Sequence, residues 1–196
     1  MTMKNKIISD YMLSFDRLNT LISFRIREVS EEDKKKQIKI ITDDLLSFLI
    51  LAYRDGIYAV SEMLNADIPV DMNSMQNAIY KRIDSENFAD RVRKHIIAGH
   101  KGKLLDMAES EYHRVFNNAM DDGANQSGIA YYKTWYTVGD GKVRDTHDYL
   151  EGVTVHGDER FFTYDVDSAM FPGGFERAEN NANCRCIVLY TRQRSR

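Results

Sequence analysis

The sequence predicts an α+β protein in which an N-terminal helical region is followed by a small α+β domain with short antiparallel strands. Apolar side chains recur every three or four residues through the first part of the chain, which is the period of an amphipathic helix. Only 2 of the 196 residues are proline, so little interrupts these helices. Of the 11 glycines, only Gly56 lies in the first half, whereas the second half also holds both cysteines and the only tryptophan. We therefore expect a helical region at residues 1–120 and a small α+β module at residues 121–196.

The helical region contains three predicted segments, each with its own boundary signal. The first carries an apolar stripe over residues 8–29. Ser30, followed by three acidic residues, favours the start of a second helix, because its hydroxyl can accept from free backbone N–H groups and acids favour the positive helix end. Pro69 ends that helix, since proline disfavours helical geometry at the preceding residue. A third helical region is expected over residues 71–98, and it resumes after a glycine-marked break at residues 104–119.

The second part has a different pattern, with aromatic and β-branched residues gathered between glycines. Expected strands are residues 135–138, residues 153–155 paired with residues 160–162, and residues 184–190. A short helix is expected over residues 143–151, with Gly152 as its C-terminal stop. Pro172 and the two glycines after it predict a loop before the last strand.

Composition excludes several classes of protein. Hydrophobic residues make up 43% and charged residues 29%, which is typical of a globular chain. The longest apolar stretch, residues 45–53, is much shorter than the roughly 18 residues of a membrane span, so no membrane partner is expected. No secretory signal is recognisable at the start of the chain, which favours a reducing compartment. The formal net charge of −3 argues against coating nucleic acid by bulk charge.

His147, Cys184 and Cys186 are the most suggestive set of side chains for chemistry. Residues two apart in a strand point to the same face, so both thiols would lie on one side and Arg185 on the other. Two sulfurs and an imidazole suit Zn²⁺, with a carboxylate or water to complete a tetrahedron. The alternative is a pair of reduced, buried thiols without a metal, because a single Cys-x-Cys lacks the second pair of a zinc ribbon.

His147 also lies among acidic residues, which raises the possibility of an enzyme. A neighbouring carboxylate, such as Asp145 or Asp148, could orient the imidazole as a general base of a metal-dependent nuclease or other hydrolase. The simpler interpretation is that Arg144 and Asp148, one helical turn apart, form a surface ion pair. No nucleophile elbow, phosphate-binding loop, dinucleotide fingerprint or zinc-protease motif occurs in the sequence. His95, His100 and His113 have spacings that do not form a ligand pair on one helix face, and we expect them on the surface or between helices.

The order of residues in the second part resembles a known pattern. It runs through Trp135, Asp140, Arg144, His147, Gly152, Pro172 and finally Cys184, Arg185 and Cys186. Over about residues 100–190 the chain resembles the phage Mu F-like minor head protein family, also called the phage head morphogenesis family. Arg144-x-x-His147 and the Cys-Arg-Cys end carry most of the resemblance.

The resemblance implies a minor capsid protein of a tailed phage or prophage, and not an enzyme. Its expected partners are the portal protein and capsid components, bound through the helical docking region, with residues 121–196 as the family's signature module. Its expected location is the virion, in the capsid interior or at the portal vertex, and the host cytoplasm during assembly. Contact with phage DNA is expected through the Arg-rich C-terminus, at Arg192, Arg194 and Arg196. A chain of this length is expected to carry no added enzyme.

Overall fold

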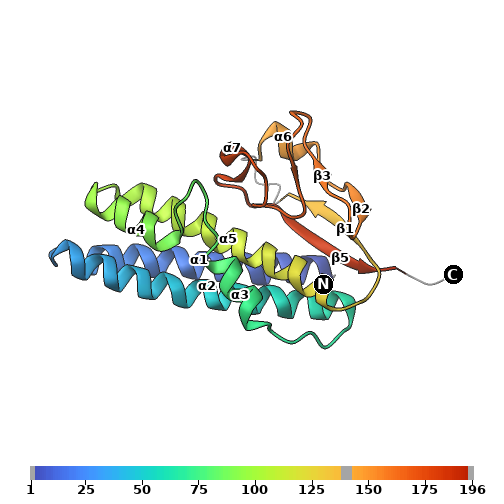
Figure 1. Ribbon diagram of the computed structural model, residues 1–196, viewed down its shortest axis with the longest axis horizontal. Coiled ribbons are helices and arrows are strands. Elements are labelled where there is room, and N and C mark those ends of the chain that lie inside the picture. Colours follow the sequence, from blue (N-terminus) through green and yellow to red (C-terminus); the bar gives the residue numbers. More distant parts are fainter. Residues whose placement is uncertain (1–2, 138–142, 194–196) are drawn as a thin grey trace.

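The computed structural model describes residues 3–137 and 143–193. It confirms an α+β protein in which helices precede a small antiparallel sheet (Figure 1). The helices of the first part are α1 (Met3–Glu28), α2 (Lys34–Leu64), α3 (Met72–Ile79), α4 (Phe88–Ile97) and α5 (Lys101–Gln126). The second part contains β1 (Tyr131–Tyr136), α6 (Asp145–Asp148), β2 (Thr154–His156), β3 (Phe161–Phe162), β4 (Ser168–Ala169), α7 (Ala178–Asn181) and β5 (Ile187–Arg192).

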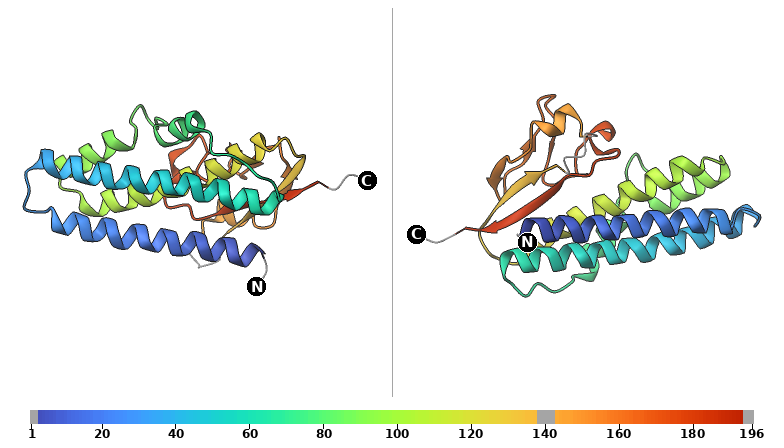
Figure 2. Two further views of the ribbon diagram at one scale, coloured as in Figure 1. Left: turned by 90° about the horizontal axis from the view of Figure 1, so that it is seen from below. Right: turned by 180° about the vertical axis from the view of Figure 1, so that it is seen from behind.

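The three long helices α1, α2 and α5 form an elongated bundle, and α3 and α4 pack along it (Figure 2). Ion pairs Lys6–Glu62 and Arg25–Asp44 join α1 to α2 near both ends, which shows that these helices are antiparallel. Asp33 caps the start of α2, because its side chain accepts a hydrogen bond from the backbone N–H of Lys36 in the first turn. The segment that carries α3 and α4 returns the chain to the end of the bundle where α2 begins, so α5 runs parallel to α2.

Gly56 explains how closely α2 and α5 approach each other. A Cβ atom at Gly56 would lie 2.5 Å from the Phe116 carbonyl oxygen and 2.7 Å from Cβ of Ala119. Gly123 of α5 plays the matching part, because a Cβ there would lie 2.7 Å from a methyl carbon of Val60. The only glycine in the first half of the sequence is therefore a packing residue at the helix–helix contact.

The expectation of one helical region over residues 71–98 is wrong in one respect, because this segment forms two helices, α3 and α4. The α3 helix ends at Ile79, and a bridge between Ile83 and Glu86 closes a tight turn in which Asp84 and Ser85 have positive φ. The α4 helix then begins with a capping box at Asn87. Apolar spacing continued through this turn and concealed it.

The strands β2, β1 and β5 form one antiparallel sheet in that order, with Thr134 opposite Thr154 and Trp135 opposite Val188. The expected pairing of residues 153–155 with residues 160–162 is wrong. The β2 strand pairs with β1, and β3 pairs with β4 in a separate two-stranded ladder. These partners depend on contacts between residues far apart in the sequence, which local patterns do not encode.

Other expected boundaries are also wrong. The strand expected over residues 135–138 is β1, which begins at Tyr131. The α6 helix spans only one turn, compared with the nine residues expected over 143–151. The last strand begins at Ile187, so both cysteines precede it. Gly152 has φ of 76°, the left-handed conformation expected at a chain reversal.

One continuous cluster of buried residues extends from α1 through α5 into the sheet. It includes Leu18 and Leu45 in the bundle and Trp135 and Val188 in the sheet, all of them inaccessible to solvent. The α5 helix continues past residue 120 to Gln126 and leads into β1. Because α5 and the core both cross this point, the division of the chain into residues 1–120 and 121–196 remains a prediction. No helix in residues 3–137 or 143–193 combines the length and apolar character needed to cross a membrane.

Candidate metal centre

The structure brings together His147, Cys184 and Cys186, the three residues that the sequence singled out. Their possible ligand atoms all lie within 4.8 Å of one another. Nδ1 of His147 is 3.5 Å from Sγ of Cys184 and 3.6 Å from Sγ of Cys186. Each of the three residues is at most 4% exposed. The group is thus a buried N,S,S cluster that could hold a metal ion.

The distances fit a tetrahedral zinc ion. With Zn–N near 2.0–2.1 Å, Zn–S near 2.3 Å and tetrahedral angles, a nitrogen and a sulfur ligand lie about 3.6 Å apart. Both N–S distances in the cluster have this value. The same distances also suit S–H and N hydrogen bonding in a metal-free chain. Donor chemistry and spacing are therefore both compatible with zinc.

Aromatic side chains hold the His147 ring in place. The ring stacks on Phe175 at a centroid distance of 5.3 Å, and it meets the edge of Trp135 at 5.7 Å. Nε2 of His147 is buried and has no hydrogen-bond partner among the described residues. The imidazole is therefore oriented by its ring packing and by the contacts of Nδ1 with the two sulfurs.

Arg144 fixes the short helix that carries His147. Its guanidinium donates to the carbonyl oxygen of Asn180 at 3.4 Å and to that of Ala182. The expected ion pair between Arg144 and Asp148 is wrong, because the arginine reaches across to the α7 segment instead. Arg144 consequently connects α6 to the chain that leads into the cysteines.

The pKa values of the two thiols differ because the thiols are hydrogen-bonded to each other. Burial alone would raise the pKa of Cys184, but donors of Cys186 and the positive charges of Arg144 and Arg185 bring it below its ordinary value. The hydrogen bond to Cys184 raises the pKa of Cys186, and burial raises it further. Cys184 is thus the thiol that becomes a thiolate first, which is the form that binds metals.

Three residues of the helical bundle lie next to this cluster, and the sequence did not indicate them. The Tyr11 hydroxyl is 2.7 Å from Nδ1 of His113, and Asn117 Nδ2 donates to the Cys186 carbonyl oxygen at 3.5 Å. Burial lowers the pKa of His113 to about 3. His113 is interhelical, as one of the two expectations had it. In the sequence, only its position on the buried face of α5 could have indicated a role at the site, and an ordinary core residue would have the same position.

The remaining signature residues shape the surrounding chain. Trp135 is completely buried near the end of β1, the central strand of the sheet, and Pro172 is buried in the loop before α7. Gly173, with φ of 84°, lets that loop approach Arg114, whose Cα would be 3.2 Å from an added Cβ. Arg185 is partly exposed between the two cysteines. Asp140 lies outside the described residues.

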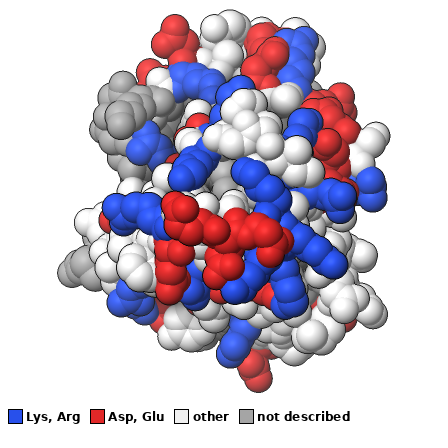
Figure 3. Space-filling model, turned by 90° about the vertical axis from the view of Figure 1, so that its left-hand side faces the viewer, with Lys and Arg blue, Asp and Glu red and all other residues white. Residues whose placement is uncertain are grey.

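Charges at the end of the bundle near the α1–α2 turn are mixed. Figure 3 shows acidic side chains at the centre of this face with lysines and arginines around them. Within the basic run at residues 34–36, Lys34 donates to a backbone carbonyl of α4 and Lys36 pairs with Glu32. The face therefore has no single sign of charge, in agreement with the balanced composition.

These features define a helical bundle whose last helix leads into a small sheet module with a buried imidazole–thiol cluster. A family model described as phage Mu protein F like protein matches residues 72–189. The match covers more than half of the chain, and the chain belongs to this family. The match begins at α3, earlier than the expected start near residue 100. No curated protein and no solved structure matches the chain.

Proposed function

We propose that the protein is a minor head protein of a tailed phage or prophage that acts in head assembly or in genome packaging and delivery at the portal vertex. Membership of the phage Mu F-like family carries this proposal. The proposed location is the virion, with the host cytoplasm as the site of assembly. The proposed partners are the portal protein and other capsid components.

The helical bundle is the part that suits docking on a larger assembly. Leu13, Leu21 and Phe24 of α1 are each 50–55% exposed, although they are large and apolar. Their spacing of eight and three residues places them along one side of the helix. Apolar side chains grouped on a surface commonly mark a protein–protein contact.

Co-expression with the portal protein of the same phage tests this function. The full chain should co-purify with portal rings at low salt, and Leu21→Ser with Phe24→Ser should reduce the amount bound. A matched double variant on the exposed side of α2, Lys39→Ser with Asp43→Ser, should bind as the wild type does. Failure of correctly folded wild-type protein to bind portal rings or procapsids would contradict the proposal.

We also propose that His147, Cys184 and Cys186 hold a structural zinc ion. The agreement between the N–S distances and tetrahedral zinc geometry supports this assignment. Bound at these ligands, zinc would cross-link α6 to the segment before β5 and so stabilise the signature module. The proposed role is structural because thiolate-rich zinc sites are usually structural and all three ligands are buried.

Metal analysis of reduced protein tests the zinc site. We expect one zinc ion per chain, a lower melting temperature after chelation, and loss of zinc in Cys184→Ser and Cys186→Ser. His156→Gln changes an exposed histidine far from the thiols and should keep the metal. Zinc-free wild-type protein whose melting temperature does not respond to added zinc would identify the pair as ordinary buried thiols.

The Arg-rich end is proposed to contact phage DNA. Arg192 is the last residue of β5, and Arg194 and Arg196 lie outside the described residues. Deletion of residues 194–196 should weaken binding to duplex DNA and reduce the dependence of binding on salt, because fewer phosphates are neutralised. Equal binding and equal salt dependence of the shortened chain would contradict this contact.

A further inference from the structure

The β3–β4 hairpin presents three apolar side chains to solvent. Phe162, Tyr164 and Val166 are 59%, 63% and 84% exposed. They alternate with Phe161 and Thr163, which are buried, so every second side chain along the hairpin faces solvent. Neither the proposed metal site nor the exposed apolar groups of α1 account for them. Large apolar side chains gathered on a surface commonly mark a protein contact.

Val166 has an unfavourable backbone conformation at the turn of this hairpin. Its φ is 66°, a left-handed value that β-branched residues rarely adopt. The turn is fixed on both sides, because the N–H of Val166 donates to the Thr163 carbonyl oxygen at 3.1 Å. The Asp167 carboxylate accepts from three backbone N–H groups and from the side chain of Asn180. Since the valine side chain is mostly exposed, packing within the chain does not offset this strain, which points to a contact outside the chain.

The hairpin and the loop that supports it are acidic. Residues 158–179 contain six acidic and two basic side chains, so this segment alone is more negative than the whole chain, whose formal net charge is −3. Glu176 lies beside the turn, since its backbone N–H donates to the Asp167 carboxylate at 3.3 Å. Its own carboxylate has no partner among the described residues. The hairpin is therefore an apolar projection with an acidic border.

The α4–α5 corner, residues 91–103, has the opposite charge. It contains five Lys and Arg side chains and no acidic one. The side chains of Arg93, Lys101 and Lys103 make no ion pair and no hydrogen bond within residues 3–137 and 143–193. Burial lowers the pKa of His95, and the basic groups around it lower that pKa further. The corner is therefore a site of positive potential.

The same corner carries an open apolar surface. Ile97 is 59% exposed at the end of α4, and Ala98 and Gly99 beside it are also exposed. A Cβ atom at Gly99 or Gly102 would have no neighbouring atom within 4 Å, so the described chain leaves these positions uncovered. The corner is thus an apolar surface with a basic border, and it complements the hairpin in both apolar character and charge.

Two copies of the chain can combine surfaces that one copy keeps apart. Figure 1 shows the α4–α5 corner at one end of the bundle and β3 toward the other end of the molecule. We infer that copies of this chain associate head to tail, with the β3–β4 hairpin of one copy seated on the α4–α5 corner of the next. Apolar groups would meet at the centre of this contact, with opposite charges around them. Because the two surfaces differ, the contact repeats from copy to copy and produces a ring or a filament.

Sedimentation of the reduced full chain over a range of concentrations tests this association. We expect the average mass to rise with protein concentration at low salt and to fall as salt is added, because salt screens the charged borders. Tyr164→Ser with Val166→Asn, the hairpin variant, should associate about tenfold more weakly. It should stay folded, since asparagine tolerates the left-handed conformation. Lys101→Glu with Lys103→Glu, the corner variant, should show a similar loss, and it should fold because acids suit the first turn of α5.

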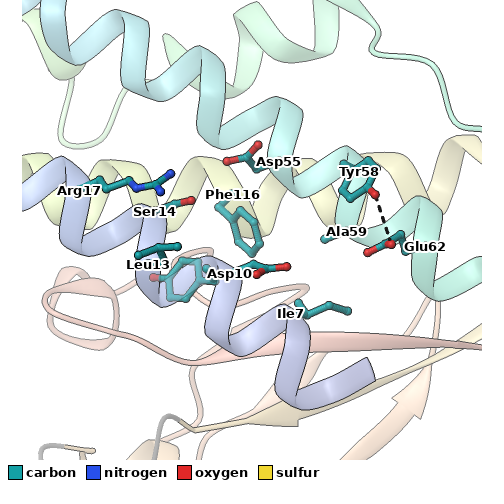
Figure 4. Close-up of a pocket in the computed structure, with 11 residues that line it drawn as sticks. Ile7, Asp10, Leu13, Ser14, Arg17, Asp55, Tyr58, Ala59, Glu62 and Phe116 are labelled. Carbon is teal, nitrogen blue, oxygen red and sulfur yellow. Dashed lines mark hydrogen bonds between the residues drawn. The ribbon is translucent and has the colours of Figure 1, made fainter. Parts of the chain in front are cut away.

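Mixing the two variants distinguishes a head-to-tail contact from a symmetric one. The corner variant keeps its hairpin and the hairpin variant keeps its corner, so the mixture should form a species of two chains and nothing larger. Tyr58→Ser with Met72→Ser is the matched control, because these side chains are 63% and 59% exposed on other helices. Figure 4 shows Tyr58 on α2, beside the cavity that α1 and α2 line. The control should associate as the wild type does.

Three results would overturn the inference. The first is a wild-type chain that stays monomeric at every concentration and at low salt. The second is normal association of the hairpin or corner variant, or an equal loss in the control. The third is a mixture of the two variants that does not recover association. None of these results depends on the portal protein, so each leaves the proposed function intact.

Discussion

The Tyr11 hydroxyl and Nδ1 of His113 form a hydrogen bond of 2.7 Å that joins α1 to α5. Both residues are buried, and burial is the main cause that raises the pKa of Tyr11; negative charge at the nearby Cys184 and Cys186 would raise it further. The first helix thus lies next to the cysteines that precede β5. The signature module is built on the helical bundle and shares its interior.

Stability should depend on pH through His113. Its folded-state pKa is about 3, whereas an unfolded histidine has a pKa near 6.5, so only the unfolded chain binds this proton between those values. The contribution is complete above about pH 6.5 and is lost as the pH falls. Relative to His113→Gln, the wild type should lose up to about 1.4 kcal/mol of unfolding free energy per pH unit below about pH 6. Urea denaturation at several pH values measures this, and parallel profiles for the two proteins would contradict it.

Gly56→Ala should destabilise the bundle. An added Cβ would come within 2.5 Å of a backbone oxygen of α5, and one of the helices must move. We expect a loss of about 1–3 kcal/mol, as for overpacked cores. Gly102→Ala is the matched control, because it lies in α5 with no atom within 4 Å of the new Cβ and should be neutral or stabilising. Thermal or urea denaturation of both variants compares them, and equal stabilities would show that the helices are less closely packed.

Arg144→Ala should loosen the connection between α6 and α7. The variant leaves the carbonyl groups of Asn180 and Ala182 without their guanidinium donor, at an expected cost of about 1.5–3 kcal/mol for hydrogen bonds to a charged group. Weaker zinc retention should accompany this loss. Arg177→Ala removes an exposed ion pair with Asp165 and should cost less than about 1 kcal/mol. A smaller effect at Arg144 than at Arg177 would show that the α6–α7 connection contributes little.

His147→Ala distinguishes a structural role from the nuclease or hydrolase alternative. The ring is 1% exposed between Trp135 and Phe175, so its removal should cost about 2–4 kcal/mol. No cleavage of DNA by the wild type is expected in zinc or magnesium. Trp135 is the only tryptophan of the chain, and its fluorescence follows unfolding at the site itself. Wild-type cleavage that disappears in a folded His147→Ala protein would support the enzyme instead.

Much of the architecture could be predicted from local patterns. The long helices were expected because their apolar stripes repeat over many turns, and the α2 start signal around Ser30 lies close to the observed cap at Asp33. The turn between α3 and α4 was missed because Ile83 keeps the apolar spacing while Asp84 and Ser85 reverse the chain. Strand partners were mispredicted because pairing depends on contacts across long loops.

The candidate site, like the fold, could be predicted from the sequence only in part. Residue type and family order pointed to His147, Cys184 and Cys186, and the geometric reason for the two cysteines was partly wrong, because they precede the strand. His113 could not be recognised, since its significance depends on Tyr11, a neighbour from another helix.

By itself, the sequence determined a helical first part, a glycine-rich second part and the identity of the imidazole and thiol groups, because helix periodicity and side-chain chemistry are local properties. Only the tertiary structure decided that Arg144 binds backbone carbonyls, that Gly56 allows α5 to pack closely against α2, and that Tyr11 and His113 form a hydrogen bond. Those facts depend on distances between elements remote in sequence, and the packing of the shared core sets these distances.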